Sequence, residues 1–180
     1  MERSAAFKIW NAIIFQLSWW LIAYWQNKAV LIVLFFITLH FFLISIENLK
    51  QELKIVFYSA GIGVFFDTLL NTLQIIKFGN ENTFFLPFWM IVLWLAFSIT
   101  LNNSLKWVFK SKIFAFSLGA CGGSLSYWAA YKLNTINIAL PIWQVLSLLF
   151  LAWGLFFGLF LYRLISPSPV SQHPVNSRLG

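Results

Sequence analysis

Asp67 is the side chain whose type and position most invite chemistry, because it is the one acidic residue well inside a long apolar segment. Lys54 lies 13 residues before it and Lys77 lies 10 residues after it, so a helix rising about 1.5 Å per residue would carry it close to the middle of a bilayer. A carboxyl group at that depth is protonated, paired or in contact with water inside the protein. We expect either a functional site or a hydrogen bond that locks helices together.

The spacing around Asp67 predicts a polar helical face. Residues on that face recur at every fourth position: Ser59, Gly63, Asp67 and Asn71. A later segment repeats small residues at the same interval and ends on an aromatic one: Ala115, Gly119, Gly123 and Tyr127. Residues four apart share one side of a helix, and small residues there let helices approach closely. We predict helix packing at Gly63, Gly119 and Gly123, with Tyr127 at a depth where it could meet Asp67.

Other apolar segments contribute polar groups that lie nearer one end of the predicted helices. Together with Asp67 they form our candidate binding site inside the membrane: Asp67, Asn71, Tyr127, Gln16, His40, Asn102 and Asn103. They suggest a polar interior that opens toward the cytoplasm. An imidazole beside a carboxyl group could relay a proton, although a packing role for His40 is the simpler alternative. Catalytic residues remain unassigned.

The usual signatures of catalysis and metal binding are absent from the sequence. It contains no HExxH, no glycine-rich phosphate loop, no GxSxG elbow and no pair of cysteines. His40 has no second histidine or cysteine near it as a metal ligand. We therefore expect no metal and no cofactor, and we favour a protein that is not an enzyme.

The elements that must position these residues are long apolar helices. Apolar residues make up 61% of the 180 positions and charged residues only 9%, which excludes an ordinary soluble domain. Polar breaks leave six segments of about the length that crosses a bilayer: 7–25, 29–46, 55–76, 84–105, 113–131 and 140–162. The predicted fold is an all-α polytopic membrane protein, a bundle of six transmembrane helices over residues 1–165. The proline-rich stretch 166–180 is predicted to be a disordered cytoplasmic tail.

The distribution of positive charge predicts the orientation of that bundle. Nine lysines and arginines fall on one side of the predicted membrane: Arg3, Lys8, Lys50, Lys54, Lys106, Lys110, Lys112, Arg163 and Arg178. Three fall on the other: Lys28, Lys77 and Lys132. The positive-inside rule then places both termini in the cytoplasm. Because the net charge of +7 is spread singly along short loops, nucleic acid is not an expected partner.

Several strings over residues 9–162 resemble one bacterial family, the domain-of-unknown-function family 2878. They are Phe15-Gln-Leu-Ser-Trp-Trp20, Gly63-Val-Phe-Phe-Asp67-Thr-Leu-Leu70, Pro87-Phe-Trp89 with Leu93-Trp94, Thr100-Leu-Asn-Asn-Ser-Leu-Lys-Trp107 and Gly122-Gly-Ser-Leu-Ser-Tyr127. The chain departs from the family pattern in two places. Asn103 stands where a histidine is expected, and Gly123 with Ser124 replaces a compact Gly-Pro pair.

The resemblance implies a small multi-pass protein of the bacterial inner membrane, encoded beside enzymes of fatty-acid cyclopropanation and lipid oxidation. It points to membrane lipid modification or envelope stress, with membrane lipids, soluble lipid-modifying enzymes or another membrane subunit as partners. Two alternatives remain open. Six helices in about 180 residues also look like the substrate-binding component of an energy-coupling-factor transporter, and Asp67 with His40 or Tyr127 would be the candidate set of a membrane-embedded lipid-modifying enzyme.

Overall fold

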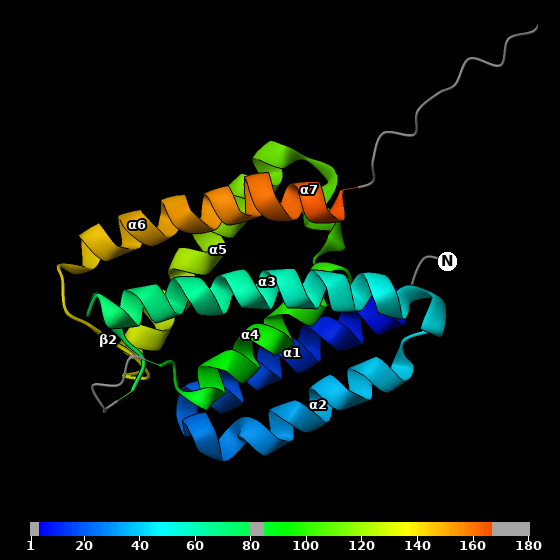
Figure 1. Ribbon diagram of the computed structural model, residues 1–180, viewed down its shortest axis with the longest axis horizontal. Helices are drawn as coiled ribbons and strands as arrows, with labels where there is room; N and C mark the ends of the chain where they lie inside the picture. Colours follow the sequence, from blue (N-terminus) through cyan, green and yellow to red (C-terminus); the bar gives the residue numbers. More distant parts are fainter. Residues whose placement is uncertain (1–3, 80–84, 167–180) are drawn as a thin grey trace, which may run out of the picture.

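A computed structural model describes residues 4–79 and 85–166, and the predicted disordered tail lies, from residue 167 onward, outside them. The described chain is a bundle of helices (Figure 1). Its longer helices are α1 (Ala5–Trp25), α2 (Val30–Leu43), α3 (Ile46–Thr72), α4 (Phe88–Leu101), α5 (Lys112–Lys132) and α6 (Ile142–Leu155). Shorter elements continue or join them: the 3₁₀ turns η1 (Gln26–Ala29) and η2 (Lys106–Lys110), the π-helical η3 (Phe156–Leu161) and α7 (Tyr162–Ile165).

Four stretches of the described chain are long and apolar enough to cross a membrane: Ala5–Leu43, Ile46–Thr72, Lys112–Lys132 and Ile142–Ile165. The first holds two helices, because the chain doubles back at η1 between α1 and α2 (Figure 1). Gln26 makes that reversal with φ at 47°, a left-handed conformation. Phe88–Leu101 is apolar but shorter. Length and composition thus define an all-α fold of the membrane-embedded type.

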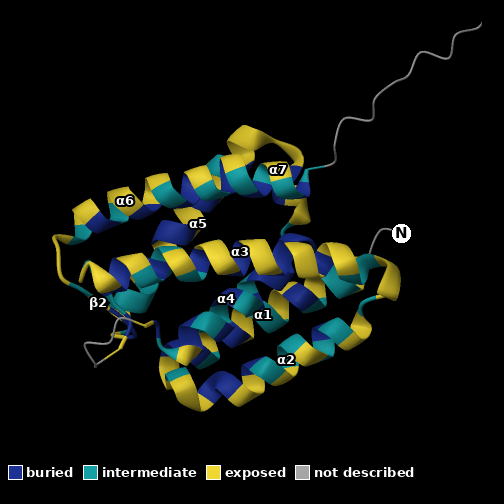
Figure 2. Cartoon of the chain, viewed as in Figure 1, coloured by how far each residue is buried: buried dark blue, intermediate teal, exposed yellow. Residues whose placement is uncertain are grey.

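Helix α4 forms the core of the bundle. Its residues from Trp89 to Leu101 are all buried or half-buried, so neighbouring helices cover most of it (Figure 2). The surrounding helices turn large apolar side chains outward, among them Phe35, Phe57, Phe65 and Leu155. A water-soluble domain does not surround its core with so many exposed rings. The outer surface therefore matches hydrocarbon, while polar groups gather inside.

Several helix ends differ by three or more residues from the ends of the predicted spans. Helix α3 begins at Ile46, nine residues before the predicted start, so that Ile44 and Ser45 alone separate it from α2. Its first turns contain Leu, Lys, Gln and Glu, which are good helix formers and not a flexible connector. Helix α4 ends at Leu101 because Asn102 and the residues after it favour turns over helix. The last helix continues past α6 as far as Ile165 through η3.

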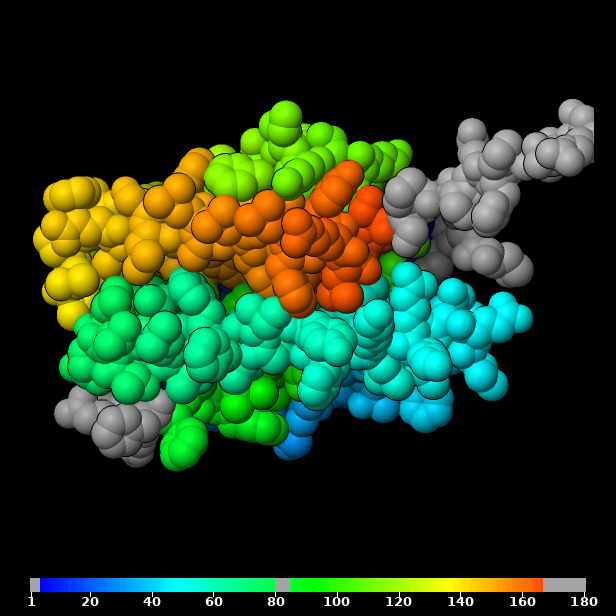
Figure 3. Space-filling view, turned by 45° about the horizontal axis from the view of Figure 1, so that its top comes forward, coloured from blue at the N-terminus to red at the C-terminus, as the bar shows by residue number. Residues whose placement is uncertain are grey.

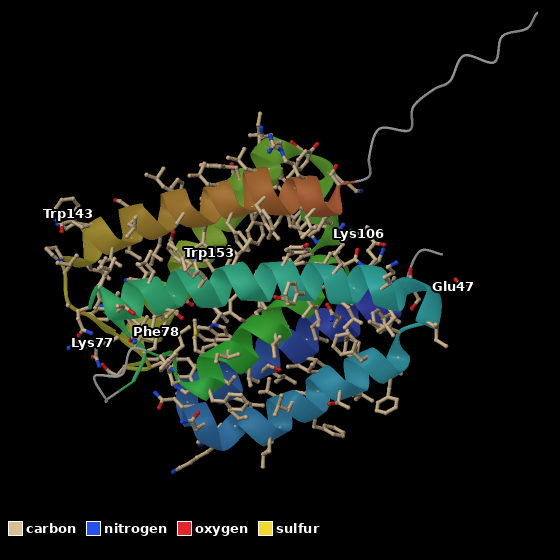
Figure 4. The ribbon with its side chains drawn as sticks, in the orientation of Figure 1. Glu47, Lys77, Phe78, Lys106, Trp143 and Trp153 are labelled. Carbon is tan, nitrogen blue, oxygen red and sulfur yellow. The ribbon has the colours of Figure 1, made fainter. Side chains whose placement is uncertain are left out.

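The ends of α3 and α5 are tied together at one end of the molecule. Strand β1 (Ile76–Lys77) pairs antiparallel with strand β2 (Asn137–Ile138), and Ile76 lies opposite Ile138. Figure 4 shows Lys77 and Trp143 at this end and Lys106 and Glu47 at the other. Lys77 and Lys106, which the charge count assigns to opposite sides, therefore lie at opposite ends of the bundle.

Candidate functional site

Asp67 lies at the meeting point of three helices. Its side chain is fully buried on α3. The hydroxyl of Tyr127 on α5 donates a hydrogen bond to Oδ1 at 2.5 Å, and the indole N–H of Trp94 on α4 donates to Oδ2 at 2.6 Å. Burying a carboxyl group is costly unless such donors replace water. The Asp67 cluster, which is Asp67, Trp94 and Tyr127, therefore joins α3, α4 and α5 through one acceptor group.

Glycines let the aromatic rings of this region approach the helices. A Cβ added to Gly63 would lie 2.3 Å from the ring of Trp94, and one on Gly123 would lie 2.2 Å from that of Trp153. Gly119 receives Phe157 in the same way, with a separation of 2.5 Å. The small residues of α5 thus face α6 and η3, and Gly63 faces α4. Asp67 and Tyr127 do meet, but the glycines of α3 and α5 do not pack these two helices against each other.

A cavity of about 580 Å³ lies beside the Asp67 cluster. We call it the groove; α1 and α5 form its two sides, and α4 lies behind it. Its lining is mainly aromatic and aliphatic and includes Gln16, Trp20, Trp94, Phe97, Leu125 and Tyr127. Two members of the Asp67 cluster therefore form part of its wall. Gly122 also lines the groove, and a Cβ added there would meet no atom within 4 Å.

A smaller cavity of about 300 Å³ lies on the other side of Trp94 and Trp153, between α3 and α6. These two helices run side by side on the face shown in Figure 3. The rings of Trp94 and Trp153 are stacked, with centroids 5.3 Å apart and planes 7° apart. This ring pair is the partition between the two cavities.

A second buried carboxyl group was missed by the sequence analysis. Glu52 on α3 is fully buried and accepts hydrogen bonds from His40 Nε2 at 3.1 Å, Asn102 Nδ2 at 2.9 Å and Asn103 Nδ2 at 2.6 Å. We call these four residues, with Asn11, the Glu52 cluster. It connects α1, α2 and α3 to the turn that follows α4, and no residue of it lines the groove.

The hydrogen bonds of Asn11 determine the tautomer of His40. The backbone N–H of Ser104, which can only donate, lies 3.3 Å from Asn11 Oδ1, and the Ser104 hydroxyl lies 2.7 Å from it. The Asn11 amide nitrogen must then face His40 Nδ1, 3.4 Å away. Nδ1 therefore accepts, so Nε2 carries the hydrogen that it donates to Glu52. The ring of Trp10 lies parallel to that of His40, with the two centroids 6.4 Å apart.

The candidate residues therefore divide between two places. Asp67 and Tyr127 are bonded to each other and Gln16 lines the groove, whereas His40, Asn102 and Asn103 gather on Glu52. The 15 residues between Glu52 and Asp67 correspond to about 22 Å along α3. The polar residues predicted to form one interior therefore lie in two clusters, and His40 is bonded to Glu52 instead of lying beside Asp67. Both clusters are closed to solvent because neighbouring helices cover them.

Asn71 has a different role from the one expected. It is buried near the end of α3, and its Oδ1 accepts the backbone N–H of Phe78 at 3.3 Å. This hydrogen bond fixes the chain that leaves α3. Glu52 was missed because it lies among lysines that suggested a loop. Its position two turns before Ser59, on the face that leads to Asp67, is the signal that could have found it.

The fold and these two clusters define a class of protein, the helical membrane proteins that carry buried carboxyl groups between their spans. Within residues 4–79 and 85–166, no group of three or more His, Cys, Asp or Glu side chains could hold a metal ion. The chain belongs to the family described as Protein of unknown function (DUF2878), whose model matches residues 8–159. No curated protein and no solved structure matches the chain.

Proposed function

We propose that this protein spans the bacterial inner membrane with six helices, keeps both termini in the cytoplasm, and binds the acyl chain of a membrane lipid in the groove. The shorter α4 is the sixth span, since its residues from Trp89 to Leu101 are buried or half-buried among the other helices. Nine positive charges on one side against three on the other support this orientation. The bound lipid would be presented to soluble lipid-modifying enzymes or to another membrane subunit, in lipid modification or envelope stress.

The groove beside the Asp67 cluster is the observation that carries this proposal. Its rim includes exposed apolar residues such as Trp20, Leu118 and Leu125, which hydrocarbon would bathe in a bilayer. The residues that border it on α5 extend from Leu118 to Ala129, and these eleven helical steps correspond to about 16 Å. One leaflet of the hydrocarbon core is about 15 Å thick. The groove therefore has the length, the lining and the lateral position that suit one acyl chain.

The Asp67 cluster contributes rigidity to this site. Its two hydrogen bonds hold Trp94 and Tyr127 in fixed positions while their rings border the groove. A ligand that enters a preformed apolar site does not pay for ordering those side chains. In this proposal Asp67 is a positioning residue and does not touch the ligand.

Native mass spectrometry of the full chain in a mild detergent tests the proposal with two matched substitutions. Gly122→Phe would fill the groove, whereas Gly61→Phe adds the same side chain to an exposed position of α3 where a new Cβ meets no atom within 4 Å. The wild type and Gly61→Phe should retain about one acyl lipid per chain. Gly122→Phe should retain at least tenfold less while unfolding at a similar temperature.

Equal lipid retention by the two variants would overturn the proposal, since the groove would then not be the binding site. A water-soluble vitamin bound to the wild type instead of a lipid would also overturn it, in favour of a transporter component.

A further inference from the structure

The groove extends to the end of the bundle where Lys106, Lys110 and Lys112 lie. Lysines at this position could determine which lipid headgroup the protein binds. Leu105, Trp107 and Val108, at and just before η2, line that end of the groove. Lys106 and Lys110 belong to the same turn and are exposed. In the sequence, Lys106 precedes Trp107 directly, and Lys110 follows Val108 by two positions. Lys112 follows at the start of α5, and we call the three lysines the groove-end lysines.

No acidic residue lies near these lysines in the sequence. The five Asp and Glu residues all lie within the first 81 positions, so that η2 and every later element contain none. Within the described parts of the chain, 4–79 and 85–166, no ion pair involves Lys106, Lys110 or Lys112. Among the described residues, these three charges therefore have no carboxylate partner within ion-pair distance at the place where the apolar groove ends.

We propose that the groove selects an anionic phospholipid, whose headgroup phosphate lies against the groove-end lysines while one acyl chain occupies the groove. This inference rests on the proposed function and adds the ligand class to it. The positive-inside rule explains lysines anywhere at this end of the bundle. It does not require them to be on the short turn that closes the groove. An anionic headgroup within reach of such lysines gains attraction that a zwitterionic one lacks.

The test is a titration of the purified full chain, in a mild detergent, with phosphatidylglycerol and with phosphatidylethanolamine of identical acyl chains, followed by native mass spectrometry. Two double variants remove equal charge from the same end of the molecule. Lys106→Gln with Lys110→Gln alters the groove-end lysines, whereas Lys50→Gln with Lys54→Gln alters exposed residues of α3. The wild type and the α3 variant should prefer phosphatidylglycerol about tenfold, and the groove-end variant should lose at least fivefold of that preference.

The results separate this proposal from the one on which it rests. If the wild type binds both lipids equally and Gly122→Phe abolishes both, the groove binds acyl chains but does not select the headgroup, and the selectivity proposal fails alone. Equal losses of preference in the two double variants would also overturn it, because only net charge would then matter. If Gly122→Phe leaves the binding of both lipids unchanged, the proposed function itself fails.

Discussion

Glu52 and Asp67 are both fully buried carboxyl groups on α3, but their surroundings differ. Glu52 is held by imidazole and amide donors from two other parts of the bundle, and its cluster adjoins no part of the groove. Asp67 is held by Trp94 and Tyr127, whose rings also border a cavity of about 580 Å³. Burial of a carboxyl group therefore does not by itself mark a binding site. The space beside its partners distinguishes the two.

The largest loss of unfolding free energy should follow from substitution of Glu52. Glu52→Ala would leave the donors of His40, Asn102 and Asn103 buried without their acceptor, which costs on the order of 3 to 5 kcal/mol of unfolding free energy. Tryptophan fluorescence during thermal unfolding in detergent measures it. Glu52→Gln, which keeps one acceptor oxygen, should lose less. Wild-type stability of Glu52→Ala would show that this cluster does not hold the bundle together.

Substitution of Asp67 should lower the unfolding free energy less than Glu52→Ala does, and it should weaken lipid binding more. Asp67→Leu leaves two donors unsatisfied, those of Tyr127 and Trp94, at a cost of roughly 1 to 3 kcal/mol. It also frees both rings that border the groove, so lipid retention measured by native mass spectrometry should fall several-fold. Glu52→Gln is the matched control, because it should lower stability and leave lipid retention unchanged. The distinction between the clusters fails if both variants lose lipid to the same extent.

Substitutions of the adjacent Gly122 and Gly123, beside the Asp67 cluster, should differ in their effect on stability. Gly123→Ala would force the ring of Trp153 to move, because the new Cβ lies 2.2 Å from it, and overpacking of this kind costs about 1 to 3 kcal/mol. Gly122→Ala meets open space and should be neutral or more stable by up to about 1 kcal/mol. Thermal unfolding of both variants should give a lower melting temperature for Gly123→Ala than for Gly122→Ala. Equal melting temperatures would contradict the packing described for α5 and α6.

Tyr127→Phe should lower stability less than Asp67→Leu does. It removes the hydroxyl that donates to Asp67 but keeps the ring and the indole N–H of Trp94, so the expected loss is about 1 kcal/mol. Lipid retention should stay near the wild-type level, since the ring still borders the groove. A loss of stability larger than that of Asp67→Leu would mean that the hydroxyl serves a partner other than Asp67.

The periodicity and composition of the sequence predicted much of the fold. Six apolar segments became six longer helices, and the family resemblance is confirmed. Asp67 and Tyr127, which their positions along the helices indicated could meet, are hydrogen-bonded to each other. The sequence analysis did not identify Glu52 as a buried residue. The lysines on both sides of it suggested a loop, and they do not show which face of a longer helix points inward.

The sequence by itself determined that these helices are apolar outside and which residues share a face and a depth, because helical geometry links spacing directly to both. Only the tertiary structure decided which helix covers each face. The reversal at η1 and the turn after α4 bring His40, Asn102 and Asn103 to Glu52. The aromatic rings of α4 and α6 occupy the glycine faces, and α1 and α5 stand apart far enough to leave the groove. Which helices contact each other depends on the angles at which they cross, and a local sequence pattern does not determine these angles.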